Sequence, residues 1–276
     1  MKKITAVIIS LLLVLCSCTP ASQSPELTVV FADVGKADFI LICCDGKFGV
    51  IDAGYKNSKD KIDGIMQEYG VKTLEFAVAT HNDKDHIGGM AHVLEKYGAK
   101  TLYITRLDGE GKQYINMLEA ASIKGIPVVK IKRNETFSLC GAVFTALSPD
   151  DSLIGLNDEN EASIVLKMQY GKKSVLFMGD AQLKAEEKLI TNYKDELLCD
   201  AIKIGHHGSD QSSSRTFLSK TNAKYAIIST GDEEPAAEVT INAISACKMQ
   251  LFNTDTDGDV VLKTNGTDLT VQKKGG

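Results

Sequence analysis

The chain has 276 residues, 43% of them hydrophobic and 24% charged, which is the composition of a folded protein with one large domain and excludes a disordered chain. Its formal net charge is −5. Loss of an N-terminal leader containing Lys2 and Lys3 would remove two positive charges and leave −7. This acidic balance argues against a broad nucleic-acid-binding face, because such a face needs clustered Lys and Arg.

The first residues have the pattern of an export signal. Lys2 and Lys3 precede the apolar run 4–15, which is too short to span a bilayer and has the length of a signal h-region. Leu15-Cys16-Ser17-Cys18 resembles a bacterial lipobox with Cys18 as the lipidated residue. We expect a lipoprotein signal peptide at 1–17, a tether at 18–26 and one domain at 27–276, exported and anchored to the cell membrane, facing outside. An ordinary cleaved signal is the alternative.

A β-meander is predicted at the start of the domain. Residues 27–33 have the pattern of a strand, and the runs 39–43 and 48–52 flank Asp45-Gly46, a strong hairpin signal. A helical pattern up to Tyr69 and a short apolar strand at 74–80 follow. Asp52, at the end of the third strand, would either orient a metal-bound histidine through its second N–H or belong to a simple turn.

Directly after the strand at 74–80, two histidines and two carboxylates fall within six residues, ahead of the glycine pair at 88–89. They are His81, Asp83, Asp85 and His86. In an extended segment alternate residues share a face, and a tight turn then brings the next two around, so all four could line one cleft. This density of ligand types indicates a metal site, with a charged surface loop and helix cap as the alternative.

The remaining chain alternates strands and helices, as helices packed on the outside of a sheet require. Strands are predicted at 101–104, 127–131, 142–147, 163–170, 174–178, 201–204 and 225–229, helices at 114–124, 182–193 and 236–247, a solvated loop at 150–161, and hairpins at Asp257-Gly258 and Asn265-Gly266.

Two further motifs follow strands in this half. Asp180 comes after a buried strand and Gly179, where a carboxylate is costly unless it meets a cation. His206 and His207 follow the strand at 201–204, so four of the 5 histidines lie in the two histidine motifs. Neighbours on an extended chain point in opposite directions, so we expect only one of this pair to face an ion.

These motifs, taken in order, resemble those of metallo-β-lactamase-fold hydrolases of the ComEC type, the competence-protein C-terminal domain. In that variant the second His of the signature at 81–89 is an Asp, and a loop resembling 33–38 precedes it. The resemblance spans about residues 27–272 and implies an α/β (α+β) fold, a four-layer αββα sandwich of two mixed β-sheets flanked by helices, in a stand-alone exported member. The family usually has Gly-His-Pro near 231–235, where this chain has Glu234 before Pro235.

The resemblance also implies the site. Two divalent metal ions, Mn or Zn, would be held by His81, Asp83, Asp85, His86, Asp180 and His207, with Asp180 bridging. The catalytic residues would be Asp85 and His206, with His206 nearer the substrate, although the reverse assignment of His206 and His207 stays open. The extra carboxylate at Asp83 favours manganese over zinc, because oxygen ligands suit manganese.

The reaction implied is hydrolysis of a phosphodiester, including DNA, by a water activated between two metals. Two alternatives stay open. The protein could be a surface phosphoesterase acting on teichoic acid or choline-phosphate esters, or a non-catalytic metal-binding surface protein in which loss of the family His at Glu234 has abolished turnover. A membrane contact through the lipid anchor at Cys18 is expected, and no protein partner is predicted.

Overall fold

The computed structural model describes residues 25–231 and 234–274. The predicted signal peptide 1–17, Cys18 and all of the predicted tether except Pro25 and Glu26 lie outside the described residues. None of the helices in the described part of the chain is both long and apolar enough to cross a bilayer.

Most of the first half of the chain, with its last two strands, forms a mixed sheet of eight strands within the described residues, in the order β15-β14-β1-β2-β3-β4-β5-β6. These strands are β1 (Leu27–Phe31), β2 (Ile40–Cys44), β3 (Lys47–Ile51), β4 (Phe76–Ala79), β5 (Leu102–Ile104), β6 (Val128–Lys130), β14 (Val260–Thr264) and β15 (Leu269–Lys273). Strands from β15 to β3 pair antiparallel, as the Asp45-Gly46 hairpin predicts, and β3 to β6 pair in parallel through helical crossovers.

The second mixed sheet has seven strands within the described residues, in the order β13-β12-β11-β10-β9-β8-β7. They are β7 (Thr136–Leu139), β8 (Ala142–Ser148), β9 (Val165–Tyr170), β10 (Lys173–Phe177), β11 (Ala201–Lys203), β12 (Tyr225–Ile228) and β13 (Gln250–Asn253). The β9–β10 hairpin was predicted, whereas the edge strand β7 was missed because its alternation of polar and apolar side chains extends over only four residues.

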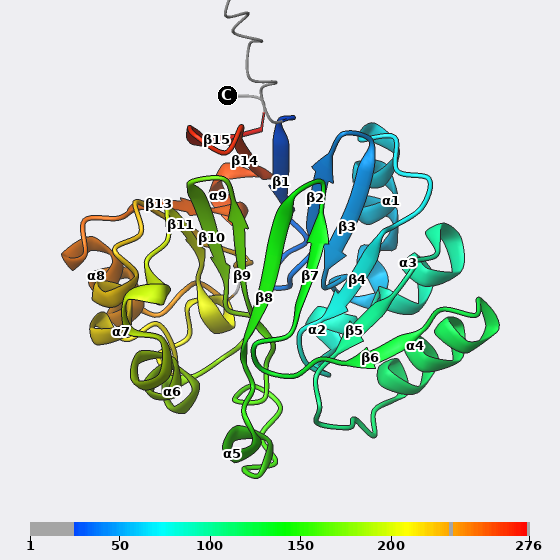
Figure 1. Cartoon of the computed structure of the whole chain (residues 1–276), viewed down its shortest axis with the longest axis horizontal. Coiled ribbons are helices and arrows are strands. Elements are labelled where there is room, and N and C mark those ends of the chain that lie inside the picture. Colours follow the sequence, from blue (N-terminus) through cyan, green and yellow to red (C-terminus); the bar gives the residue numbers. More distant parts are fainter. Residues whose placement is uncertain (1–24, 232–233, 275–276) are drawn as a thin grey trace, which may run out of the picture.

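Helices cover the outer face of each sheet (Figure 1). On the first sheet lie α1 (Lys59–Glu68), α3 (Met90–Tyr97) and α4 (Lys112–Ile123), and on the second lie α6 (Leu183–Tyr193), α7 (Arg215–Thr221) and α8 (Glu238–Ala246). The shorter helical turns are η1 (Lys56–Ser58), α2 (Lys84–Ile87), α5 (Asp151–Ile154), η2 (Lys194–Leu197), η3 (Gly205–Gly208) and α9 (Thr254–Asp257).

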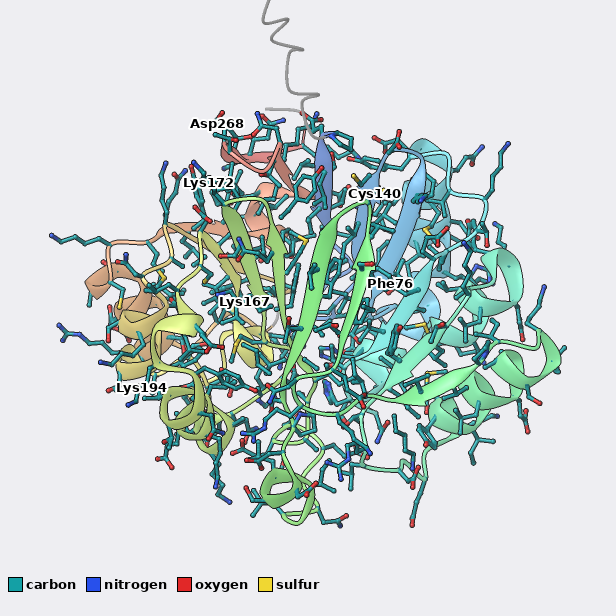
Figure 2. All side chains as sticks on the ribbon, in the orientation of Figure 1. Phe76, Cys140, Lys167, Lys172, Lys194 and Asp268 are labelled. Atoms are coloured by element: carbon teal, nitrogen blue, oxygen red, sulfur yellow. The ribbon has the colours of Figure 1, made fainter. Side chains whose placement is uncertain are left out.

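The buried apolar residues confirm the layered αββα architecture. One cluster lies between the sheets, and two lie between a sheet and its helices. In β1, Leu27, Val29 and Phe31 face the other sheet while Val30 faces the helices, which is the period-2 alternation of a strand. Phe76, labelled in Figure 2, packs its ring 5.2 Å from the Phe144 ring across the two sheets.

Two predicted loops differ from the structure. The hairpin expected at Asp257-Gly258 is wrong, because β13 and β14 belong to different sheets and α9 carries the chain between them. The expected solvated loop at 150–161 contains α5, which Asp150 caps by accepting from two backbone N–H groups. Glu161, at its end, is buried and accepts from the backbone N–H groups of Lys184 and Ala185 at the start of α6.

The carboxyl ends of five strands meet at one edge of the sandwich. β3 leads to Asp52, β4 to His81, β10 to Asp180, β11 to the η3 histidines and β12 to Ser229. Because neighbouring parallel strands end at the same edge, this topology collects residues that are far apart in the sequence.

Candidate metal centre

The predicted ligands converge at this edge. The side chains of His81, His86, Asp180 and His207 are fully buried, while Asp85 is 18%, His206 25% and Asp83 42% exposed. One ligand atom each from Asp85, His86, Asp180 and His207 lies within 4.8 Å of the others, the spacing that a single cation needs. The buried side chains thus form a wall, and the more exposed ones form its solvent-facing rim.

The protonation of His86 and His207 shows that this group fits a cation. His86 Nδ1 lies 2.7 Å from the Asp52 carboxylate, and His207 Nδ1 lies 3.0 Å from the Ser229 carbonyl, so each Nδ1 carries a proton that it donates. In the neutral rings both Nε2 atoms are then lone-pair acceptors, yet they lie 3.1 Å apart beside the Asp180 carboxylate. Burial acts to lower the pKa of His86, but the Asp180 and Asp52 carboxylates outweigh it and raise the pKa well above the usual range. The group therefore needs a positive charge at this point, which a metal cation would supply in place of the proton.

Asp180 lies between two groups of histidines. Its Oδ1 is 3.1 Å from His86 Nε2, and its Oδ2 is 3.6 Å from His207 Nε2 and 3.8 Å from His81 Nε2. Burial acts to raise the pKa of Asp180, but the adjacent His86 and His207 outweigh it and hold the pKa well below the usual range. Asp180 thus lies within 4 Å of histidines from both groups, which is the position that a bridging ligand would occupy.

The second group is built on His81. The Thr80 hydroxyl donates to Asp52 Oδ2 at 2.7 Å and lies 3.1 Å from His81 Nδ1, so it accepts the Nδ1 proton. His81 Nε2 is then a buried acceptor, and it has no hydrogen-bond partner among the described residues. Asp83 Oδ2 is 3.6 Å away. Asp52 therefore orients both His86 directly and His81 through Thr80.

Glu159 is a neighbour of Asp83 that the sequence reasoning missed. The nearby His81 ring lowers the pKa of Asp83 to about 2. Burial and the hydrogen bond to Asp83 raise the pKa of Glu159 to about 7. Two carboxyl groups in contact share a proton in this way, or share a cation. In the sequence, the position of Glu159 in the acidic stretch 150–161 was the signal that could have indicated it.

The His206-His207 pair does not follow the extended geometry assumed for it. Both residues have left-handed backbone angles, with φ of 47° and 51°, so both rings turn towards Asp180. His206 Nε2 lies 3.8 Å from Asp180 Oδ2, and its Nδ1 lies 3.1 Å from the Gln182 amide nitrogen. With that amide donating, the ring proton of neutral His206 is on Nε2. Burial lowers the pKa of His206.

A buried ion pair supports the centre from behind. Lys203 Nζ lies 2.8 Å from Asp38 Oδ2, and both side chains are buried. Asp38 also donates its backbone N–H to the carbonyl of Asp85, and its Oδ1 is 3.7 Å from His207 Nδ1. At the position of the missing family histidine, Glu234 pairs with Lys36 at 3.0 Å.

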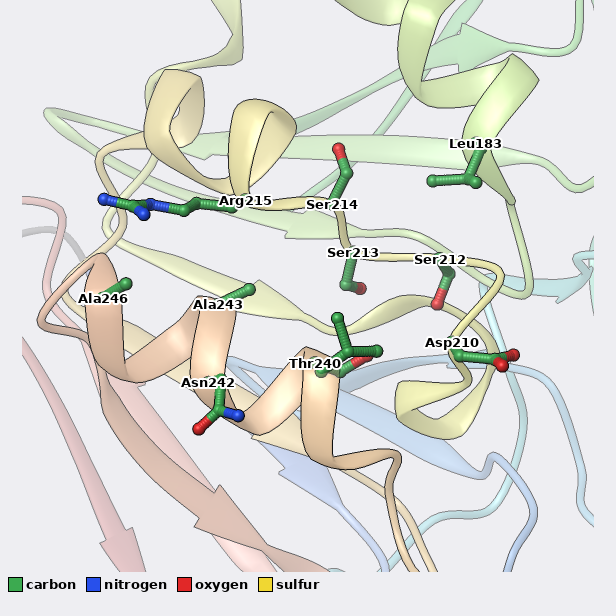
Figure 3. A pocket seen from close by; sticks show the side chains of 11 residues that line it. Leu183, Asp210, Ser212, Ser213, Ser214, Arg215, Thr240, Asn242, Ala243 and Ala246 are labelled. Atoms are coloured by element: carbon green, nitrogen blue, oxygen red, sulfur yellow. The ribbon is translucent and has the colours of Figure 1, made fainter.

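A hollow of about 390 Å³ is lined in part by the segment 210–215, which follows the η3 histidines (Figure 3). Its walls include Leu183, the serines at 212–214 and Ala243. Buried Glu186 accepts the backbone N–H groups of Ser213 and Ser214, and burial raises its pKa to about 7. None of the candidate ligands lines this hollow, so it is separate from the metal centre.

Comparisons with known proteins agree with this geometry. A family model described as the metallo-beta-lactamase superfamily matches residues 33–232. ComE operon protein 3 of Bacillus subtilis is 28% identical over 195 residues, which cover 69% of this chain and 25% of that protein. Competence protein ComA of Neisseria gonorrhoeae is 27% identical over 84% of this chain and 32% of its own length. Recombination protein 2 of Haemophilus influenzae is 29% identical over 77% of this chain and 25% of its own length.

The chain thus spans about a quarter to a third of the length of these curated relatives. Among solved structures, the metallo-beta-lactamase fold protein YhfI from Bacillus subtilis has a TM-score of 0.55 at 12% identity, covering 87% of this chain and 100% of that chain. Igni18, a metallo hydrolase from Ignicoccus hospitalis, has a TM-score of 0.59 at 15% identity, covering 86% of this chain and 98% of that chain. These structures show the same fold.

Proposed function

The chain belongs to the metallo-beta-lactamase superfamily, and from this membership we propose that it is a metal-dependent phosphodiesterase that acts on nucleic acid. The observation that carries the proposal is the convergence of His86 Nε2, His207 Nε2 and an Asp85 carboxylate oxygen on Asp180, within the spacing that one metal ion allows. Three relatives have names that refer to competence or recombination, and this supports nucleic acid as the substrate.

Two divalent cations, manganese or zinc, would be held by two overlapping sets of ligands. Asp85, His86 and His207 form one set, and His81 and Asp83 form the other, with Asp180 common to both. Three carboxylates in the combined set favour manganese. When bound, such ions would supply Lewis acidity towards the phosphate oxygens and make an attacking water more acidic.

The chain's own residues then bind and orient the substrate. His206 is the rim residue that would contact the phosphodiester, because its Nε2 carries a proton and lies beside Asp180. Its lowered pKa keeps the ring neutral at pH 7, so that it would donate a hydrogen bond to a phosphate oxygen rather than compete for a cation. Asp85, on the same rim, would hold a metal ion on the side that faces the substrate.

The test is to load the domain with manganese or zinc and to offer single-stranded DNA, a chromogenic phosphodiester and a choline-phosphate ester side by side. Asp85→Ala and His207→Ala should abolish hydrolysis, because each removes a ligand. His206→Ala should slow turnover while the metal stays bound. Cleavage of only the choline ester would favour the surface phosphoesterase. Bound metal with no cleavage of any phosphodiester would leave a metal-binding surface protein.

We also propose that the protein is exported and held at the cell membrane by a lipid on Cys18. The pattern of Lys2, Lys3, the apolar run 4–15 and the lipobox supports this proposal. Detergent partitioning of the full chain and of Cys18→Ala tests it. The full chain should enter the detergent phase and the variant should stay in water, and an aqueous full chain would reject the anchor.

A further inference from the structure

A hollow with hydrogen-bond donors and no carboxylate lies beside the metal centre. Its volume is about 440 Å³, and its walls are Tyr55, Lys56, Asn57, Lys84 and Gln113. These residues come from three places, namely the turn η1 and its preceding residue, the start of α2, and the start of α4. The two ammonium groups and two carboxamides suit an anionic ligand with polar edges.

The hollow adjoins the metal centre through two of its residues. Lys84 stands in the chain between the rim residues Asp83 and Asp85. Burial and the negative charges of Asp85 and Glu234 raise the pKa of Tyr55, so its hydroxyl lies within the electrostatic field of the centre. The hollow therefore lies next to the rim of the candidate metal centre.

The lysines of the hollow are available to a ligand. Among the described residues, no carboxylate lies within ion-pair distance of Lys56 or Lys84, whereas Lys36, at another side of the centre, is paired with Glu234. A neighbouring hollow of about 460 Å³ shares Lys56 and Gln113 and adds Lys59 and Lys112, although it also contains Glu95 and Glu119. The two added lysines and the two glutamates balance in charge, so the excess of positive charge is confined to the first hollow.

The backbone holds the two lysines in place. At Gly88 an added Cβ would lie 2.3 Å from the Lys84 carbonyl oxygen and 2.6 Å from the Lys56 backbone nitrogen, so only glycine allows α2 and η1 to approach this closely. The Ala53 N–H donates to the His86 carbonyl at 2.7 Å, which joins the same two segments. The backbones of the two lysines are thus fixed close together, while their exposed side chains are free to reach a ligand.

We propose that this hollow is a subsite for a single-stranded nucleic acid, which it holds next to the scissile phosphodiester. Lys56 and Lys84 contact flanking phosphates, and the half-buried ring of Tyr55 offers a face on which a base can stack. That ring favours nucleic acid over a polyol phosphate, which has no flat face. The inference rests on the proposed function, and it concerns binding rather than cleavage.

The experiment measures the anisotropy of a fluorescent oligo-dT bound to protein carrying Asp85→Ala, so that cleavage does not interfere. Lys56→Gln/Lys84→Gln in this background should weaken binding by at least about 10-fold, and the slope of log affinity against log salt should fall by about 0.7 per lysine. Lys220→Gln/Lys248→Gln is the matched control, because it removes the same charge from exposed lysines on the other helix layer. It should change the affinity less than about 2-fold.

Tyr55→Ala separates stacking from charge. It should weaken oligo-dT by roughly 5- to 100-fold and leave an abasic strand of equal length nearly unaffected. Equal losses in the two lysine pairs, or none in Lys56→Gln/Lys84→Gln, would overturn the subsite. Equal competition by poly(glycerol phosphate), with no effect of Tyr55→Ala, would overturn nucleic acid as its ligand. Failure of the proposed function is seen separately, as absence of phosphodiester cleavage by the wild-type protein loaded with metal.

Discussion

The ammonium group of Lys203 and the carboxylate of Asp38 form a buried ion pair 2.8 Å long, next to the metal-centre histidine His207. Lys203 ends β11, directly before the η3 loop, and Asp38 precedes β2 in the other sheet. The pair therefore joins the two sheets at the edge where the ligands meet. Burial acts to raise the pKa of Asp38, but Lys203 and His207 outweigh it and lower the pKa.

Lys203→Met should destabilise the fold by about 3–5 kcal/mol, because it leaves the Asp38 charge buried without its partner. Urea unfolding in the presence of a chelator measures this without a contribution from metal. Lys203→Met/Asp38→Leu should recover most of the loss, since no unpaired charge remains. Lys173→Met is the control, because Lys173 pairs with Asp200 nearer the surface and should cost no more than about 1 kcal/mol. A Lys203→Met loss as small as the control would contradict the buried-pair account.

Asp52→Asn should weaken metal binding by about 10- to 100-fold, because an amide orients His86 and Thr80 less strongly than a carboxylate does. Competition with a chromogenic chelator measures the affinity. Asp63→Asn is the matched control, since Asp63 lies 3.0 Å from His92 in a histidine–carboxylate pair on the helices. Equal affinities for both variants would show that Asp52 has no role in metal binding.

Asp180→Ala should lower the metal content at both sites, whereas a ligand of one set should affect chiefly its own ion. The reason is that the two oxygens of Asp180 face different histidines. Elemental analysis of protein purified without chelator should give near two metal equivalents for the wild type and well under one for Asp180→Ala. Asp200→Ala, which breaks a pair with Lys173, should keep the wild-type content. Retention of both metals by Asp180→Ala would remove this residue from the centre.

Glu186→Gln should flatten the dependence of stability on pH between about 4.5 and 7. Burial raises the pKa of Glu186 to about 7, so in this window the folded protein binds a proton that the unfolded chain has released. The contribution of Glu186 to the free energy of unfolding therefore falls as pH rises from 4.5 to 7 and is level above. Thermal unfolding across this range measures the slope, and identical slopes in both proteins would contradict the assignment. Exposed Glu187→Gln is the control.

The sequence alone predicted the fold class and most of the elements. The Asp45-Gly46 and Asn265-Gly266 turns and the apolar run of β1 are local signals, and they predicted their hairpins and strand correctly. The same local reasoning wrongly predicted a hairpin at Asp257-Gly258, since a turn residue does not say whether the next strand joins the same sheet. It missed β7, because the polar and apolar alternation of this edge strand covers only four residues.

The ligand types were also readable, because histidines and carboxylates were grouped at strand ends. The spacing of these residues along the chain did not predict which other side chains they contact. The Asp52–Thr80–His81 chain, Glu159 beside Asp83 and the Lys203–Asp38 pair join segments that are distant in the chain, and only packing brings them together. The left-handed backbone of His206 and His207 likewise reversed the expectation from an extended chain.

Composition determined that the protein is acidic overall. Net charge sums over the whole surface, however, and does not state where each charge lies. Gly88 lets η1 approach α2, and this contact puts Lys56 and Lys84 around one hollow at the edge of the metal centre. The sequence thus determined which groups the protein has, by local pattern. The tertiary structure decided which of them share a site, because that depends on how the strand ends and loops pack.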